Sequence, residues 1–94
     1  MNKQSGELAK LKNLGVATIN ILHAVGINNY DDLQTIGPVE TYLRIKRRDI
    51  HVSKVMLYAL QGALMDTHWN ELSAELKQQL LDNAGESSHT TETP

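Results

Sequence analysis

The hydrophobic residues of this chain recur at helical spacing in six short segments. In 7–12, Leu8 and Leu11 lie three positions apart on one face, before polar and glycine residues interrupt the pattern. In 17–25, one face carries Ala17, Ile21, Leu22 and Val25. Gly26 then supplies the left-handed conformation that commonly closes a helix. The sequence therefore predicts two short helices joined by a tight turn.

Four further helices follow, and each is bounded by residues that favour helix ends. Ser and Asn side chains accept hydrogen bonds from the first free N–H groups of a helix, and proline suits its first position. The expected helices and their boundary residues are 30–36 with Asn29 and Gly37, 38–48 with Pro38, 54–65 with Ser53, and 74–84 with Ser73 and Gly85. No segment has a persuasive strand pattern and there is no long repeat. The prediction is an all-α fold, a compact bundle of five or six short helices.

The size and composition of the chain fit one small domain without covalent cross-links. Its 94 residues include no cysteine, which excludes disulfides, thiolate nucleophiles and cysteine-based zinc sites. At this length roughly 60–65% of the unfolded chain's surface can be buried, so the core is thin. The polar ends indicate a flexible N-terminus at 1–6, a helical domain at 7–85 and a disordered tail at 86–94.

Charge and hydropathy argue against a polycation and against a membrane span. The formal net charge is -2, so any basic binding surface must be local. The longest uncharged run, 13–30, holds four asparagines and a histidine and is too polar to cross a bilayer. The first residues include no apolar segment of signal-peptide type. We therefore expect a soluble, cytoplasmic protein with no membrane contact.

Short motifs spread over 8–81 form a combination that is more specific than any one of them. They are Leu11-Lys12-Asn13-Leu14-Gly15, Leu22, Val25-Gly26-Ile27, Asp32-Leu33, Ile36-Gly37, Tyr42-Leu43, Leu57-Tyr58-Ala59-Leu60-Gln61-Gly62-Ala63-Leu64 and His68-Trp69. This combination resembles the C-terminal domain of the TfoX/Sxy family of bacterial competence regulators. The resemblance implies a helix-hairpin-helix, SAM-like fold and a role in regulating natural competence and DNA transformation. Family members often carry a separate N-terminal α/β domain, which is absent from this sequence.

The strongest local charge is a basic run that joins the fourth and fifth predicted helices. It consists of Arg44, Lys46, Arg47, Arg48 and Lys54, against one acidic residue, Asp49. Such a run suits contact with DNA phosphates or with an acidic protein face. A second explanation is structural, because a helix dipole attracts basic residues to its C-terminus and short charge runs are commonly solvated. The run is the leading candidate for a partner- or DNA-binding surface.

The first hairpin is the second candidate site. Its residues are Lys12, Asn13, Leu14 and Gly15. They resemble the nonspecific DNA-binding hairpin, in which backbone N–H groups at a glycine turn and at the following helix N-terminus hold a phosphate. Such hairpins usually place glycine on both sides of one apolar residue, whereas Asn13 here would hinder a close approach of the backbone. Gly15 is also explained as a plain turn former.

The sequence offers little for catalysis or for metal binding. No two of the histidines have the spacing of metal ligands on one helical face; they are His23, His51, His68 and His89. The sequence has no cysteine nucleophile, Gly-x-Ser-x-Gly motif or P-loop. Trp69, the only tryptophan, is expected to pack between the central helix, 54–65, and the last helix, or to anchor an interface. We therefore expect a non-catalytic module without metal, cofactor or small-molecule substrate.

Three functions remain open on the sequence alone. The leading one is a regulatory module that binds a protein partner of the transcription or competence machinery through the basic run. The second is direct, largely nonspecific DNA binding by the first hairpin together with that run, which a steep salt dependence would reveal. The third is a homo-oligomer, because the apolar helix at 55–65 could be shared between two chains.

Overall fold

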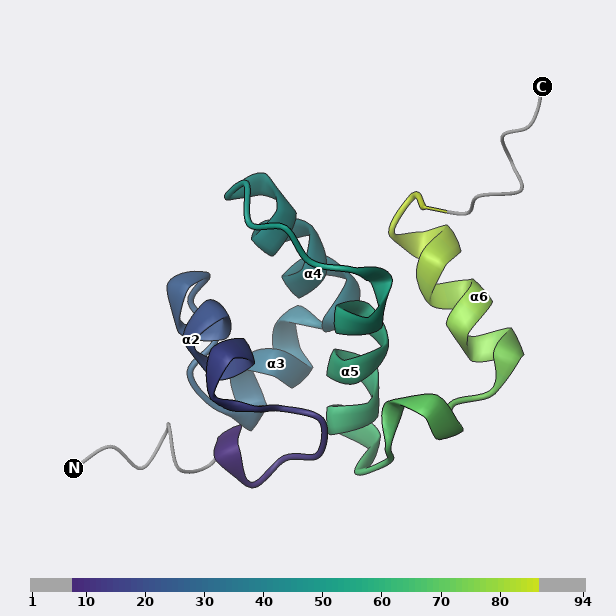
Figure 1. Cartoon of the computed structure of the whole chain (residues 1–94), viewed down its shortest axis with the longest axis horizontal. Coiled ribbons are helices and arrows are strands. Elements are labelled where there is room, and N and C mark those ends of the chain that lie inside the picture. The colour runs from purple at the N-terminus through teal and green to yellow at the C-terminus, as the bar shows by residue number, and fades with distance from the viewer. Residues whose placement is uncertain (1–7, 87–94) are drawn as a thin grey trace.

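A computed structural model describes residues 8–86, and every regular element within that range is a helix (Figure 1). Leu8 and Ala9 are helical. The later elements are α2 (Val16–Ala24), α3 (Tyr30–Ile36), α4 (Pro38–Arg47), α5 (Lys54–Met65), the 3-10 turn η1 (Trp69–Glu71) and α6 (Ala74–Asn83). The predicted all-α bundle of short helices is confirmed.

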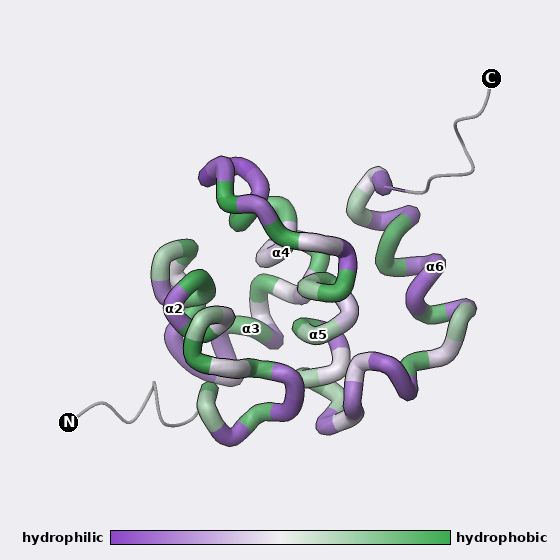
Figure 2. Tube along the Cα trace, in the orientation of Figure 1, coloured by the Kyte–Doolittle hydropathy of each residue, from purple (hydrophilic) through white to green (hydrophobic). Residues whose placement is uncertain are grey.

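Helix α5 lies at the centre of the bundle. It contacts α3, α4, α6 and η1, and Figure 1 shows α2, α3 and α4 on one side of it and α6 on the other. Leu57 and Leu60 of α5 are fully buried, as is Leu33 of α3. Figure 2 shows apolar residues along α5 and a hydrophilic stretch where α4 ends. The basic residues that belong to α4 therefore lie at the surface, near the end of the helix.

The predicted helix boundaries rest on side-chain caps and on glycine turns. Proline occupies the start of α4, as expected. The side-chain oxygen of Asn29 accepts a hydrogen bond from the Asp32 N–H at 2.8 Å. The hydroxyl of Ser53 accepts from the Val55 N–H at 3.2 Å, and that of Ser73 from the Leu76 N–H at 3.0 Å. Each cap stabilises its helix by about 1 kcal/mol. Gly26 and Gly37 take φ values of 88° and 89°, which side chains disfavour, so glycine is required at both turns.

Helices α2, α4 and α6 differ from their predicted boundaries by one residue. Helix α2 begins at Val16, which is 77% exposed although it lies three residues before the buried Ile19. Helix α4 ends at Arg47 because Asp49 turns into the left-handed region with φ of 64°. These shifts lie within the ordinary uncertainty of helix ends.

Trp69 lies between α5 and α6, as predicted, but in a 3-10 turn of its own. Its ring is stacked on Tyr58 of α5, with 6.2 Å between the ring centroids. The ammonium of Lys77 on α6 sits 5.4 Å from the Trp69 centroid and 5.5 Å from that of Tyr58. A cation over two aromatic faces is attracted by both rings, so this cluster ties α6 to the central helix.

The predicted ends of the chain fall mostly outside the described residues. This applies to the N-terminus at 1–6 and to residues 87–94 of the predicted tail. The sequence places Glu86 in that tail, whereas its carboxylate accepts a hydrogen bond from the Tyr42 hydroxyl at 2.8 Å and pairs with Lys46. The chain after α6 is therefore anchored on α4 at this residue.

Candidate partner-binding surface

The basic run is divided among several places on the surface. Arg44, Lys46 and Arg47 belong to the last turn of α4, and Arg48 follows as its C-terminal cap. Lys54 opens α5 instead. Positive side chains at the end of α4 complement the partial negative charge of its last carbonyl groups, which is one physical reason for their position.

Two of the arginines share one carboxylate within α4. The Nε atom of Arg44 donates to Glu40 at 3.2 Å, and Nη2 of Arg47 donates to both oxygens of Glu40 at 3.3 Å. The Arg44 hydrogen bond is the main cause that lowers the pKa of Glu40, and Arg47 adds to it. Glu40 therefore stays ionised at neutral pH and pairs with both guanidinium groups.

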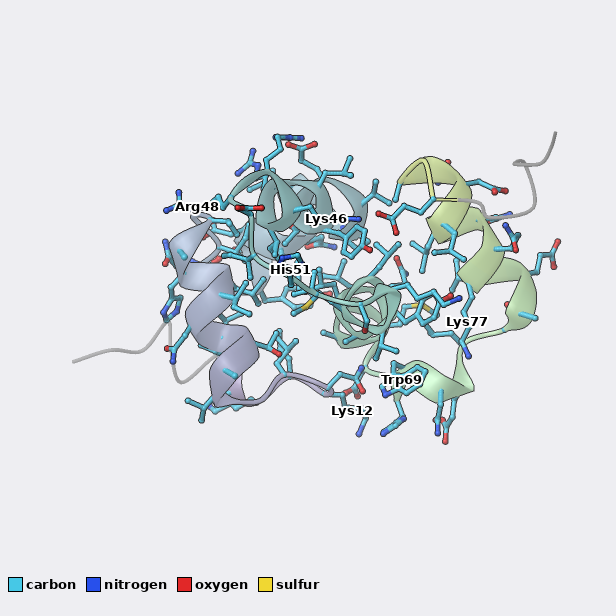
Figure 3. All side chains as sticks on the ribbon, turned by 45° about the horizontal axis from the view of Figure 1, so that its top comes forward. Lys12, Lys46, Arg48, His51, Trp69 and Lys77 are labelled. Atoms are coloured by element: carbon cyan, nitrogen blue, oxygen red, sulfur yellow. The ribbon has the colours of Figure 1, made fainter. Side chains whose placement is uncertain are left out.

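Lys46 makes a different contact, on the side of α4 that faces the end of α6 (Figure 3). Its hydrogen bond to Glu86 lowers the pKa of that carboxyl and raises the pKa of Lys46. Burial raises the pKa of the Tyr42 phenol, and its bond to Glu86 raises it further. This contact joins α4 to the end of α6, so Lys46 is less available to a partner than its sequence position suggests.

The three arginines of the basic run line a shallow pocket beside the end of α2. The pocket has a volume of about 300 Å³ and is lined by Ala24, Val25, Arg44, Arg47 and Arg48. Figure 3 shows Arg48 next to the end of α2, away from Lys46. Glu40 pairs with Arg44 and Arg47 but not with Arg48, so these three arginines and Glu40 together carry an excess of two positive charges. We call these five lining residues the arginine pocket; it suits a partner's carboxylate, because arginine binds such groups with two parallel hydrogen bonds.

In the first hairpin, Asn13 is bound to the rest of the protein. Its Nδ2 donates to the carbonyl of Thr67 at 3.0 Å and more weakly to that of Ala59 at 3.4 Å. Its Oδ1 accepts from the Trp69 N–H at 3.1 Å. Its φ is 72°, a conformation that asparagine tolerates better than most residues. Asn13 therefore fixes the hairpin against the end of α5 and η1.

Gly62 makes that contact close enough to form. A Cβ atom built on Gly62 would lie 2.5 Å from the Thr67 carbonyl oxygen and 2.6 Å from Nδ2 of Asn13. Neither separation is tolerated in a packed interior. The absence of a side chain at Gly62 therefore allows the hairpin to approach α5.

The other hairpin residues differ from Asn13 in exposure. Leu14 is buried in the core, whereas Lys12 and Gly15 are exposed. A Cβ built on Gly15 would meet no atom within 4 Å, and Gly15 precedes α2 without a side-chain cap. The start of α2 also carries no acidic residue in its first turn. This end of α2 therefore keeps the partial positive charge that a phosphate would require.

The two candidate sites do not merge into one surface. The hairpin lies at the start of α2 and the arginine pocket at its end, and a nine-residue helix is roughly 13 Å long. Figure 3 accordingly shows Lys12 beside Trp69 and far from Arg48. A ligand that uses both sites must extend along α2.

Two acidic residues, Glu40 and Glu86, shape the basic surface. Glu40 could have been recognised from its spacing of four residues before Arg44 on one helix. Glu86 pairs with Lys46 across 40 residues, and no local pattern reveals that contact. Among residues 8–86 no group of three His, Cys, Asp or Glu side chains could hold a metal ion. No helix in that range is long and apolar enough to cross a membrane.

The fold and this surface define a small all-helical module with an arginine pocket at one end of α2 and a hairpin at the other. The chain belongs to the TfoX C-terminal domain family, which matches residues 4–84, and the predicted resemblance is confirmed. This is a regulatory type of domain and not a known enzyme family. Among curated proteins, none matches the chain significantly.

Two solved structures, both from Listeria monocytogenes, have the same fold. An uncharacterized protein in a triclinic crystal form is 34% identical, with a TM-score of 0.74 over 78% of this chain and 83% of that one. A protein of unknown function in a tetragonal form is 31% identical, with a TM-score of 0.77 over 86% of this chain and 100% of that one. Both structures therefore agree with the family and the fold, and they identify no ligand.

Proposed function

We propose that the domain is a non-catalytic regulatory module that binds a protein partner in the control of natural competence. The arginine pocket is the partner-binding surface, and Lys54, at the start of α5, lies apart from it. The observation that carries the proposal is the pairing of Arg44 and Arg47 with Glu40, which positions two guanidinium groups beside Arg48. Side chains held in this way lose less conformational freedom when a partner's carboxylate binds them. The membership of a regulatory family supports the same reading.

The ion pairs that Glu40 and Glu86 form with the basic run favour a protein ligand over DNA. Affinity for a duplex grows with the number of phosphates that basic side chains neutralise. Glu40 and Glu86 already occupy Arg44, Arg47 and Lys46 in part, which reduces the charge available to a continuous phosphate backbone. A protein face with one or two acidic side chains matches the excess of charge in the arginine pocket better.

Direct DNA binding remains the second candidate because of one observation, the open start of α2. Gly15 is exposed, has free space around it and precedes a helix without a side-chain cap or a first-turn acid. A phosphate could approach these backbone groups, with Lys12 nearby. Asn13 is engaged in hydrogen bonds within the domain and adds nothing to that contact.

Titration of a labelled random-sequence duplex, followed by fluorescence anisotropy, separates the two candidates. For a protein-binding module we expect no saturable binding even at about 50 mM salt, because multi-phosphate binders gain most of their affinity at low salt. Saturable binding that fades by about 200 mM salt would instead make DNA the ligand. In that case Gly15→Ala should weaken binding at the hairpin without unfolding the domain, and replacement of Arg47 and Arg48 by alanine should lower the salt slope.

A further inference from the structure

We propose that a second surface, the groove between the first hairpin and the start of α5, binds an acidic amphipathic segment of a protein partner. The groove is separate from the arginine pocket, which lies at the other end of α2. The inference rests on the proposed function only in that the partner is a protein. It would extend the contact surface along the whole length of α2.

The groove has a volume of about 250 Å³ and a lining that mixes apolar and polar side chains. The lining residues are Asn13, Thr18, Val52, Ser53, Val55, Met56, Ala59 and Trp69. Val55 is 36% exposed, and Trp69 and Met56 are half-buried although both pack against the core. Apolar side chains left open to water beside a concave surface gain free energy when a partner covers them. The groove is therefore suited to an apolar side chain of the partner.

The charged residues directly next to the groove lining in the chain are two lysines. None of the lining residues is acidic, and Lys12 and Lys54 are exposed neighbours of Asn13 and Val55 in the chain. Neither lysine forms an ion pair with another residue of 8–86. Helices α2 and α5 both begin here, and neither has an acidic residue in its first turn, which adds partial positive charge. Acidic side chains that flank the partner's apolar residue would complement this rim.

A peptide fits these features better than a nucleic acid backbone. Phosphates and sugars carry no apolar group large enough to cover Val55 and Trp69, so DNA would leave the groove floor in water. The amide of Asn13, the most polar group of the lining, is already hydrogen-bonded to Thr67 and Trp69. An amphipathic segment instead supplies apolar and acidic side chains on one face, as helix-in-groove recognition requires.

The probe is a displayed library of random peptides about 16 residues long, which is roughly 24 Å as a helix. It is selected on the full chain at low salt, and enriched peptides are then titrated as labelled synthetic peptides. Val55→Gln is the test variant, and Met65→Gln is its matched control on the same helix. Met65 is also exposed, at 48%, but lies ten positions away at the other end of α5. Both variants keep an uncharged exposed side chain, so the fold is retained in each.

We expect enriched peptides with apolar residues at helical spacing between acidic residues. Val55→Gln should weaken their binding at least tenfold and Met65→Gln less than twofold. Replacing Lys12 and Lys54 by alanine should weaken it by roughly two- to fivefold each, as for partly exposed charge pairs. The proposal is overturned if no acidic amphipathic sequence is enriched, or if the selected peptides bind the Val55→Gln variant as tightly as the original chain.

A third outcome separates this inference from the proposed function. If the enriched peptides lose affinity with Arg48→Glu and keep it with Val55→Gln, the arginine pocket is a protein-binding site and the groove is not. If the groove variants instead weaken the binding of a random duplex, the groove belongs to a nucleic-acid surface, and the inference is wrong.

Discussion

The Asn13 side chain provides the sharpest stability prediction. Two of its hydrogen bonds, at 3.0 and 3.1 Å, have ordinary lengths, and the third, at 3.4 Å, is weak. Each good bond contributes about 1 kcal/mol net. Alanine at a φ of 72° adds about 1 kcal/mol of backbone strain. Asn13→Ala should therefore lower the free energy of unfolding by roughly 3 kcal/mol.

Thermal and urea unfolding, followed by circular dichroism, measure this loss. For a domain of this size it corresponds to a decrease in Tm of roughly 12–24 °C. Asn13→Gly removes the same hydrogen bonds without the strain and should lose about 1 kcal/mol less. Asn20→Ala, at an exposed position of α2, is the control and should change stability by less than about 0.5 kcal/mol. If Asn13→Ala is as stable as Asn20→Ala, the hairpin is not held by this side chain.

Three further predictions concern single residues. Gly62→Ala should destabilise the fold by roughly 1–3 kcal/mol in urea unfolding, despite alanine's better helix propensity, whereas Gly15→Ala should be nearly neutral; equal effects would contradict the close packing at Gly62. Thr41→Val should stabilise the fold by roughly 1 kcal/mol, because the buried Thr41 hydroxyl has no hydrogen-bond partner among residues 8–86; a loss would show that the hydroxyl is satisfied. Glu86→Gln should lower Tm slightly at neutral pH. The Lys46 hydrogen bond lowers the pKa of Glu86, so the stability contributed by the ionised carboxylate is fully present above the unfolded carboxyl pKa of about 4.3. It is lost as the pH falls through the lower pKa of Glu86 in the folded protein. A Tm difference that persists at low pH would refute this origin.

Much of the fold could be predicted because local chemistry marks the helix ends. Asn29, Ser53 and Ser73 cap their helices through their own side chains, and Gly26 and Gly37 take the positive φ values that end a helix. These signals act over three or four residues, so a single sequence displays them. Val16 shows the limit, because it lies three residues before the buried Ile19 and yet is exposed, which apolar spacing alone does not reveal.

The candidate site was less predictable because its geometry depends on distant partners. The basic run reads as one cluster in the sequence, but Lys46 turns to Glu86, and Arg44 and Arg47 turn to Glu40. Asn13 likewise reads as a defect in a DNA-binding hairpin, whereas its partners Thr67 and Trp69 lie more than 50 residues away. Contacts at such separations leave no local pattern.

The most direct test of the account is affinity capture from an extract of the source organism with three forms of the chain. The forms are the original, Arg48→Glu in the arginine pocket, and Lys10→Glu, an equal charge reversal on the exposed turn before the hairpin. We predict a protein that the original and Lys10→Glu retain after nuclease treatment, and that Arg48→Glu retains at least fivefold less, since like charges repel across an interface. Equal retention by all three forms, or retention that nuclease abolishes, would contradict a protein-binding role for the arginine pocket.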